Sequence, residues 1–494
     1  VTYADGADII TASAGTSNFR AGVNAGNSIE SGGNYNVCVG DEAGTAITTG
    51  DENVAVGYQA LDAQTTEGYN TAVGRAAGGV NTSGSGLVAV GYQAADANTT
   101  GDFNTAVGYQ ALGGNTTAGN NTAVGYYALL ANTTGTSSVA VGVNALLVNT
   151  TGADNTALGK DSLKANTTAS NNTAVGKDAL AANTTGTGNT AVGLSSGAAL
   201  TTGDFNNAFG RNALLTNTTG DNNTALGGNA LKLATTSSNN TAVGQDALKA
   251  NTTGTSNVAM GYLAMDASTT ADQNTAVGKS AMGACTTGGF NAALGDSAMH
   301  ALTTGANNVG VGVSSGGSTV NLTTGSQNAF LGNYCHTSAA DSISQTVLGY
   351  NVVGSANNTL TVGNAGSDST LAYGGTTWSA PSDLRYKKNI ADSTAGLSFI
   401  NDLRPITFEW KNEGDLPEGH RARVEGSTTP YNNPNTNHGF VAQEVKTAID
   451  NHSEIKDGFR MWSEDEADDR QRVGDGYLVP MLVKAIQELS AQVE

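Results

Sequence analysis

The sequence has little of what builds ordinary globular cores and disulfide frameworks. Of its 494 residues, 6% are aromatic and 13% are charged, and three cysteines lie far apart. Their odd number and wide spacing exclude a disulfide framework and the usual zinc motifs, and no cofactor or metal is expected. The chain has no apolar run long enough to cross a bilayer and no signal-like N-terminus. Membrane insertion is therefore not expected.

Proline and positive charge are also scarce, and both are unevenly placed. All six prolines and more than half of the 22 Lys and Arg residues lie beyond residue 380. This shift in composition predicts a domain boundary there. The net charge of −20 extends over both parts and leaves no basic patch, so no nucleic-acid partner is expected.

Glycine, by contrast, is abundant and periodic. The glycine that ends a T-A-V-G-like tetrapeptide recurs every 17 residues from Gly40 to Gly312, slips by three to Gly332, resumes at Gly349 and fades at Gly363. Seventeen residues are too few for a helical-hairpin repeat or a propeller blade, but they suit a coil of two brief strands and two turns. The predicted fold class is an all-β parallel β-solenoid, a β-roll of about twenty coils.

The apolar positions of one repeat indicate how the coils pack. Adjacent Ala106 and Val107 must point to opposite sides of a strand, and so must Ala111 and Leu112 if that stretch is extended. A thin coil has one interior, so the second apolar face predicts contact with another surface, most simply an identical chain. Stacked coils also align equivalent asparagines, which are expected to form a hydrogen-bonded ladder. They are Asn104, Asn121, Asn155, Asn172, Asn189, Asn206, Asn223, Asn240, Asn257, Asn274 and Asn291.

The repeat motif N-T-A-V-G-x-x-A-L-x-x-N-T-T-G resembles the head repeats of trimeric autotransporter adhesins and the collar-like repeats of phage tail fibres. The resemblance covers most of the chain and implies a homotrimeric fibre. On this basis residues 1–33 are expected to be an N-terminal connector or cap. Residues 34–365 would be the solenoid shaft, and residues 366–381 a neck.

The segment after the neck resembles another family. Ser382-Asp-Leu-Arg-Tyr-Lys-Lys-Asn-Ile390, Leu403-Arg-Pro-Ile-Thr-Phe-Glu-Trp-Lys411 and His438-Gly-Phe-Val-Ala-Gln-Glu-Val445 are similar to three motifs of the endosialidase-type intramolecular chaperones of phage tail spikes and fibres. The resemblance implies that residues 382–494 are a small α+β chaperone domain that cleaves itself from the fibre.

The same resemblance implies the site residues. Ser382 would attack the Pro381–Ser382 peptide bond, and Lys387 would take its proton. That chemistry needs a neutral amine, which burial or a nearby cation such as Arg385 or Lys388 would favour. An offset of five places two side chains on opposite faces of a straight strand, so the motif must bend.

The chain ends in a predicted helix. Val479, Leu482, Ile486, Leu489 and Val493 step by three and four residues, which is the seam of a coiled coil, and Pro480 suits a first turn. The alternative is an amphipathic helix packed on its own domain. The acidic run 464–469 lacks EF-hand spacing and reads as a solvated loop. The only indication of a functional role for His438 is the motif in which it lies.

The favoured function is a structural virion tail fibre for host attachment, trimerised and released by its own chaperone domain. Its expected partners are a host cell-surface receptor, either a glycan or a surface protein, and the virion baseplate or a preceding fibre segment. It would be assembled in the host cytoplasm and located in the virion tail. No external substrate is expected, and too few acids are present for a depolymerase cleft. The alternatives are a cell-surface trimeric adhesin and an ice-binding solenoid with a regular array of Thr pairs.

Overall fold

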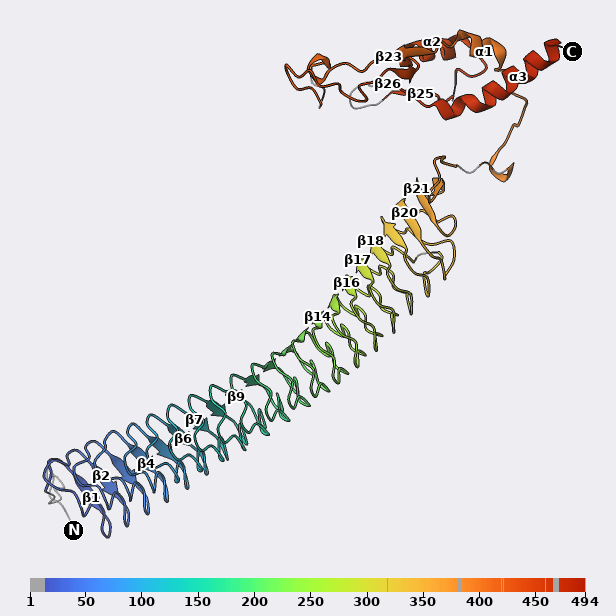
Figure 1. Cartoon of the computed structure of the whole chain (residues 1–494). Coiled ribbons are helices and arrows are strands. Elements are labelled where there is room, and N and C mark those ends of the chain that lie inside the picture. Colours follow the sequence, from blue (N-terminus) through green and yellow to red (C-terminus); the bar gives the residue numbers. More distant parts are fainter. Residues whose placement is uncertain are drawn as a thin grey trace, which may run out of the picture. The chain divides into compact units, whose positions relative to one another are not determined.

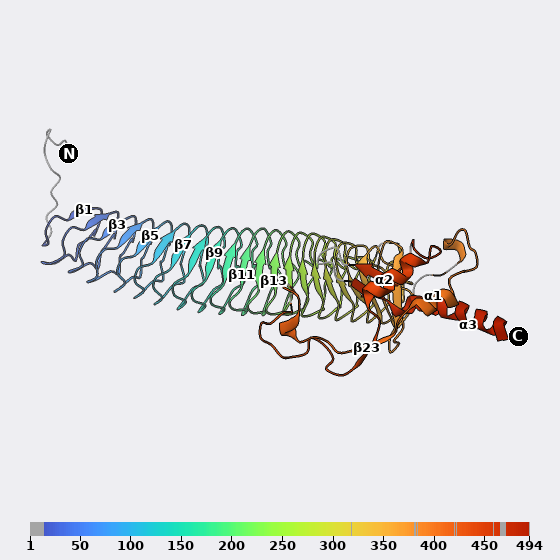
Figure 2. The ribbon, with the colours of Figure 1, turned by 90° about the horizontal axis from the view of Figure 1, so that it is seen from above.

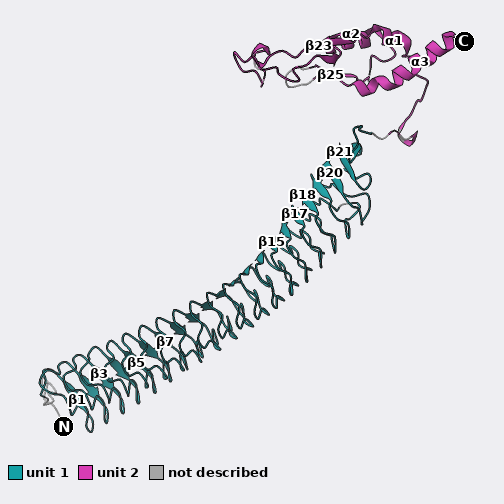
Figure 3. Ribbon diagram, viewed as in Figure 1, with its two compact units in different colours: residues 1–381 teal, residues 382–494 magenta. Residues whose placement is uncertain are grey.

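The computed structural model describes residues 14–317, 319–379, 382, 384–418, 420, 422–457, 459–464 and 471–493. The chain divides into two compact units, Val1–Pro381 and Ser382–Glu494 (Figure 3). The start of the predicted connector (residues 1–13), Pro381 and most of the acidic run lie outside the described residues. Each unit is described by itself below.

Unit 1 is a stack of coils, each contributing one short strand to a single sheet (Figures 1 and 2). From β1 to β21 each strand pairs in parallel with the next; β6 and β7, for example, align Ala106 with Ala123. This confirms the parallel β-solenoid predicted from the 17-residue period. In the described residues the sheet has 22 strands. They are β1 (Phe19–Ala21), β2 (Val37–Val39), β3 (Val54–Val56), β4 (Thr71–Val73), β5 (Val88–Val90), β6 (Thr105–Val107), β7 (Thr122–Val124), β8 (Val139–Val141), β9 (Thr156–Leu158), β10 (Thr173–Val175), β11 (Thr190–Val192), β12 (Asn207–Phe209), β13 (Thr224–Leu226), β14 (Thr241–Val243), β15 (Val258–Met260), β16 (Thr275–Val277), β17 (Ala292–Leu294), β18 (Val309–Val311), β19 (Ala329–Leu331), β20 (Gln345–Tyr350), β21 (Thr359–Asn364) and β22 (Ser367–Ala372).

The two ends of the stack depart from the regular coil. β1 already pairs with β2, so the solenoid begins inside the stretch expected to be a connector or cap. At the other end β22, in the stretch expected to be a neck, runs antiparallel to β21. A final strand with an unpaired edge exposes a row of N–H and C=O groups. β22 covers the edge of β21 and becomes the last strand of the sheet, with one bridge from Thr370 to Ser379 on its other side.

Each coil contains one strand where two were expected. After β6 the chain keeps turning, because Gln110 and Leu112 adopt left-handed φ angles of +48° and +55°. As a result both Ala111 and Leu112 point into the coil and have no exposed surface. The prediction that these two residues face opposite sides is wrong, since it assumed an extended backbone.

The strict glycine register has a steric cause. Gly108 has a φ of +138°, which L side chains rarely adopt, and a Cβ built on it would lie 2.4 Å from the carbonyl oxygen of Gly125. The next coil therefore approaches too closely for any side chain at this position. The same contact recurs from coil to coil, so the period of the sequence is the period of the stack.

Buried asparagines line the inside of the coils. The N–H of Asn121 donates to Asn104 Oδ1 at 3.0 Å, and Asn121 Nδ2 donates to the carbonyl oxygen of Gly135 at 2.9 Å. These bonds join consecutive coils and confirm the predicted ladder. A second buried ladder includes Asn115, whose Nδ2 donates to Asn98 Oδ1 at 2.7 Å. Because most of the buried amides are satisfied by their neighbours, most of the polar interior does not carry the cost of unpaired groups; Asn70 Nδ2, Asn183 Oδ1 and Asn251 Oδ1 are exceptions.

From β2 to β19 the middle residue of each strand points into the coil and the third residue points outward. In β6, Ala106 is fully buried, whereas Val107 faces outward and stays partly exposed. The outward position is apolar in every coil from β2 to β20, and we call it the outer apolar row. Its members are Val39, Val56, Val73, Val90, Val107, Val124, Val141, Leu158, Val175, Val192, Phe209, Leu226, Val243, Met260, Val277, Leu294, Val311, Leu331 and Leu348.

Unit 2 is a small α+β domain around one apolar core. Phe399, Val445, Ile449 and Met461 form its centre, with 3% exposure or less. No described helix is long and apolar enough to cross a membrane. Its elements are η1 (Leu384–Tyr386), α1 (Leu397–Asp402), β23 (Ile406–Phe408), η2 (Glu413–Asp415), β24 (Asn437–Gly439), α2 (Ala442–Asn451), β25 (Trp462–Glu464), β26 (Gln471–Val473), η3 (Asp475–Leu478) and α3 (Val479–Val493). β23 pairs antiparallel with β24, and β25 with β26.

Candidate cleavage and assembly site

The two residues expected to carry self-cleavage lie within hydrogen-bond distance of each other. Lys387 Nζ donates to Ser382 Oγ at 2.7 Å. Between them the chain forms the single 3₁₀ turn η1, in which the N–H of Lys387 donates to the carbonyl oxygen of Leu384 at 3.1 Å. This turn supplies the bend that an offset of five residues requires.

Both side chains are exposed in this single chain. Proton transfer to Lys387 needs a neutral amine, which burial would favour, and neither side chain is buried here. Pro381, the other side of the expected scissile bond, lies outside the described residues. The geometry therefore brings the pair together, while its catalytic role stays a prediction.

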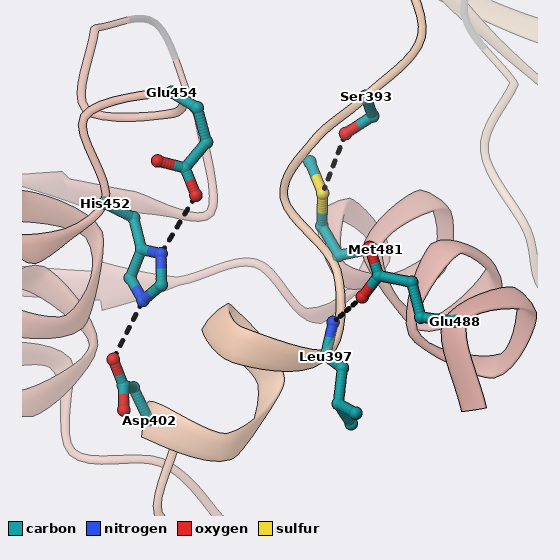
Figure 4. A network of polar contacts seen from close by, with 7 residues as sticks. All are labelled: Ser393, Leu397, Asp402, His452, Glu454, Met481 and Glu488. Atoms are coloured by element: carbon teal, nitrogen blue, oxygen red, sulfur yellow. Dashed lines mark hydrogen bonds and ion pairs between the residues drawn. The ribbon is translucent and has the colours of Figure 1, made fainter. Parts of the chain in front are cut away.

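A buried histidine joins the two helices that precede and follow the β23–β24 hairpin. His452 follows α2, and its Nε2 lies 2.8 Å from Oδ2 of Asp402, the last residue of α1. Its Nδ1 lies 3.0 Å from Glu454 Oε1 (Figure 4). The ring also meets the edge of Phe399, with centroids 5.4 Å apart.

This arrangement favours the protonated ring. The hydrogen bond to Asp402 is the main cause that raises the pKa of His452, and burial opposes it. The pKa of Glu454 is lowered, first by the hydrogen bond from its own backbone N–H and then by the one from His452. Sequence reasoning missed this network, because Asp402 and His452 are 50 positions apart and no motif joins them.

A second contact in Figure 4 ties α1 to α3. The residue before α1 is Gly396, which makes no side-chain cap. Instead, the N–H of Leu397 donates to Glu488 Oε2 at 2.8 Å, so a carboxylate from α3 satisfies the first turn of α1. Ser393 Oγ also lies 3.8 Å from Met481 Sδ. The C-terminal helix is therefore fixed to the segment that follows η1.

The stability of unit 2 is expected to fall as pH rises above neutrality. A histidine whose pKa is raised by folding contributes its full stabilisation below its ordinary value of 6.5 and loses it as pH passes through the raised pKa. Glu454, with a lowered pKa, contributes above its ordinary value of 4.5 and loses this contribution as pH falls. Maximum stability is therefore expected between these values. Urea unfolding of the full chain from pH 4 to pH 9, followed by tryptophan fluorescence, measures this.

The variant His452→Gln should remove the decline on the alkaline side. The matched control is His438→Gln, which replaces an exposed histidine on β24 and should leave the pH dependence unchanged. An equal slope in His452→Gln and the wild type would contradict the assignment.

The predicted seam of the C-terminal helix faces away from its own unit. In α3, Val479, Ile486 and Val493 are 58%, 65% and 88% exposed, whereas Ala485 on another face is buried. The alternative that this apolar stripe packs on its own domain is wrong. The seam is left available for other chains.

An aromatic hollow of about 500 Å³ lies beside the β23–β24 hairpin. Trp410 and Tyr431 meet edge to face within it, with centroids 5.7 Å apart, and His420 packs on Tyr431 at 5.4 Å. Four of its lining residues, Phe408, Glu409, Trp410 and Lys411, belong to a motif that the sequence singled out.

Comparison with known proteins agrees with the motifs. Residues 382–454 match the model of the protein family described as the chaperone of endosialidase, and this range contains both Ser382 and Lys387. No curated protein and no solved structure matches the chain. The resemblance noted for the C-terminal segment is confirmed. A β-solenoid of about twenty turns followed by such a chaperone region is the organisation of a tail-fibre-like or tail-spike-like protein.

Proposed function

We propose that this protein is the shaft of a virion tail fibre that serves host attachment, built as a parallel homotrimer by its own C-terminal chaperone region. The observation that carries the proposal is the outer apolar row. It runs along the whole solenoid of a chain whose end matches an assembly chaperone.

The outer apolar row is too large to remain in contact with water. Leu158, Leu294 and Leu331 are 46%, 51% and 55% exposed. With adjacent coils about 4.8 Å apart, the row forms one continuous strip on the order of 1,000 Å². Monomeric proteins rarely expose a contiguous apolar area of that size. Burial against identical rows of parallel chains would remove the strip from water.

Composition favours the strand face as the subunit interface. The position one residue after each repeat glycine is also exposed, but it holds Tyr58, Arg75, Lys160 and Asp296 in different coils. Such a mixture suits a surface that stays in water. The outer apolar row admits no polar residue from β2 to β20, as expected for positions covered by a partner.

The chaperone region offers the second contact. The exposed seam of α3 would join the three chains at their C-terminal ends before the coils stack. Because every coil resembles the next, chains displaced by one coil would keep most of their contacts, and a common starting point is needed. Cleavage would then follow: Ser382 Oγ attacks the Pro381 carbonyl, Lys387 takes the proton, and water hydrolyses the resulting ester. The products are a Pro381 carboxylate and a free Ser382 amine.

The remaining partners and the location follow from this role. The shaft would bind a host cell-surface receptor and attach to the baseplate or a preceding fibre segment, in a virion tail assembled in the host cytoplasm. A cell-surface adhesin would use the same trimeric shaft. In the Thr pairs, the hydroxyl of the first threonine donates to a carbonyl oxygen of the next coil; Thr116 Oγ1, for example, donates to the carbonyl oxygen of Thr133 at 3.0 Å. The ice-binding alternative therefore loses half of its array of hydroxyls.

The test of the assembly role compares the full chain with a deletion of residues 382–494. The full chain should give uniform trimers by light scattering, whereas the deletion variant should give aggregates or rods of irregular length. Well-formed trimers from the deletion variant would refute the chaperone role. Attachment is tested by the binding of labelled, assembled fibres to a panel of bacterial strains, and fibres that bind no strain would refute the attachment role.

A further inference from the structure

Three phenylalanines, the third being Phe290, occupy a left-handed corner of the coil, and two of them share further features that Phe290 lacks. Phe103 and Phe205 occupy the position before the ladder asparagine, with φ of +56° and +55°. In other coils this left-handed position holds mostly polar residues such as Asn120, and it is also aromatic at Tyr35, Tyr69 and Phe290. A bulky residue is strained there, since only glycine and short polar residues adopt left-handed angles readily. The rings of Phe103 and Phe205 are also 65% and 61% exposed.

Each ring lies over a glycine of the preceding coil. A Cβ built on Gly86 would lie 2.8 Å from Phe103 Cδ1, and one on Gly188 would lie 2.7 Å from Phe205 Cδ1. From Tyr35 to the last coil, this position holds glycine only at these two places, each one coil before a phenylalanine. The paired glycines leave room for the rings to lie close against the backbone of the preceding coil.

A fixed carboxylate precedes each ring. Asp102 Oδ1 accepts hydrogen bonds from the N–H and the hydroxyl of Ser85 at 2.8 and 3.1 Å. Asp204 Oδ1 likewise accepts from the N–H and hydroxyl of Thr187 at 2.6 and 3.1 Å. Among the described residues, neither Oδ2 atom has a hydrogen-bond partner. The hydrogen bonds to Oδ1 therefore orient each carboxylate, and Oδ2 is left to accept a hydrogen bond from a ligand.

The whole segment occurs twice. Thr-Thr-Gly-Asp-Phe-Asn spans residues 99–104 and again 201–206, and in both copies the second threonine, Thr100 or Thr202, is exposed. An exposed ring, an oriented carboxylate and a free hydroxyl thus share one corner of the coil in two places. The stacked tyrosines on the next corner differ, since Tyr92 and Tyr109 lie face to face with centroids 5.0 Å apart and cover each other.

We propose that these two segments are binding sites for a neutral glycan, an inference that rests on the attachment role and specifies its receptor. The apolar face of a sugar ring packs on an aromatic ring, and its hydroxyls donate to a carboxylate. The aspartates and the net charge of −20 disfavour acidic glycans and nucleic acids. One ring per site is far less than the roughly 800 Å² that a protein partner needs. Six coils separate the sites, about 29 Å at 4.8 Å per layer, so a fibre would bind a long glycan at several points.

The test uses the full chain carrying both Phe103→Asn and Phe205→Asn. Asparagine fits the left-handed position, as at Asn120, so the solenoid should fold at least as well as the wild type. The probe is an array of neutral glucans, mannans, galactans and chitin oligomers, together with sialylated and uronate-containing oligosaccharides. The wild type should bind a neutral member, and the double variant should bind it at least tenfold more weakly. Saturation transfer from the phenyl protons to the bound sugar should disappear.

The control variant is Tyr262→Gln, which removes another exposed aromatic ring and introduces the residue found at Gln245 in the same position of the preceding coil. It should bind as the wild type does. Equal binding by the double variant, binding of acidic glycans alone, or dissociation of the double variant into single chains would overturn the inference. If wild-type fibres bind bacterial cells and the double variant binds them equally, the glycan sites fail while the attachment role stands. If wild-type fibres bind no cell, the attachment role fails instead.

Discussion

Ser382→Ala is expected to leave the chain uncut and fully assembled. Removing a nucleophilic serine lowers the rate constant by on the order of 10⁶-fold, which places cleavage beyond detection. The variant should remain at 49.5 kDa per chain, whereas the wild type should release a fragment that begins at Ser382. Intact-mass spectrometry and N-terminal sequencing distinguish the two. Trimers should form in both, because assembly uses the core of unit 2 and the seam of α3.

Matched variants separate the chemistry from folding. Lys387→Ala should also block cleavage, whereas Lys388→Ala and Ser393→Ala should be cut normally. Because Ser382 and Lys387 are exposed in the single chain, cleavage should also depend on assembly, which can bury the pair and favour the neutral amine. The cleavage rate should therefore rise with protein concentration. Cleavage of Ser382→Ala at the wild-type rate would refute the role of this serine.

Replacing Val107, Val124 and Val141 together with aspartate is expected to separate the chains without unfolding the coils. Each substitution places an unpaired carboxylate in a dry interface, at a cost of at least several kcal/mol, and parallel chains bring like charges together. Once residues 382–494 are released, light scattering of the shaft should show single chains in place of trimers. Circular dichroism should still report β structure, because the three side chains point away from the interior of the coil.

Two control variants make this result specific to the outer apolar row. Tyr109→Asp changes the position after the repeat glycine, where Asp41 and Asp296 already occur, and it should leave the trimer intact. Ala106→Asp places the charge inside the coil, where Ala106 has no exposed surface, and it should prevent folding. If the triple valine variant stayed trimeric with unchanged stability, the strand face would not be the interface.

Much of this protein could be predicted from periodicity and motifs. A glycine every 17 residues implied a stacked solenoid, because each repeat must supply the same contact to the next. In the structure this contact is the close approach of Gly108 to the backbone of Gly125. The asparagine ladder followed from the same register. The three C-terminal motifs indicated an endosialidase-type chaperone, and the family comparison agrees over residues 382–454.

Tertiary structure decided which side of each coil the apolar residues occupy. The sequence by itself determined that Ala106 and Val107 face opposite ways, but both are apolar, so only the closed coil shows that the alanine is inside and the valine outside. The apolar pair Ala111 and Leu112 could have pointed to opposite sides of a strand or both into the coil. The left-handed φ of Leu112 turns both side chains inward. Likewise, His452 meets Asp402 only because the core brings α1 against α2. Periodicity determines what repeats, whereas the direction of a side chain in a turn depends on backbone angles that the apolar pattern does not specify.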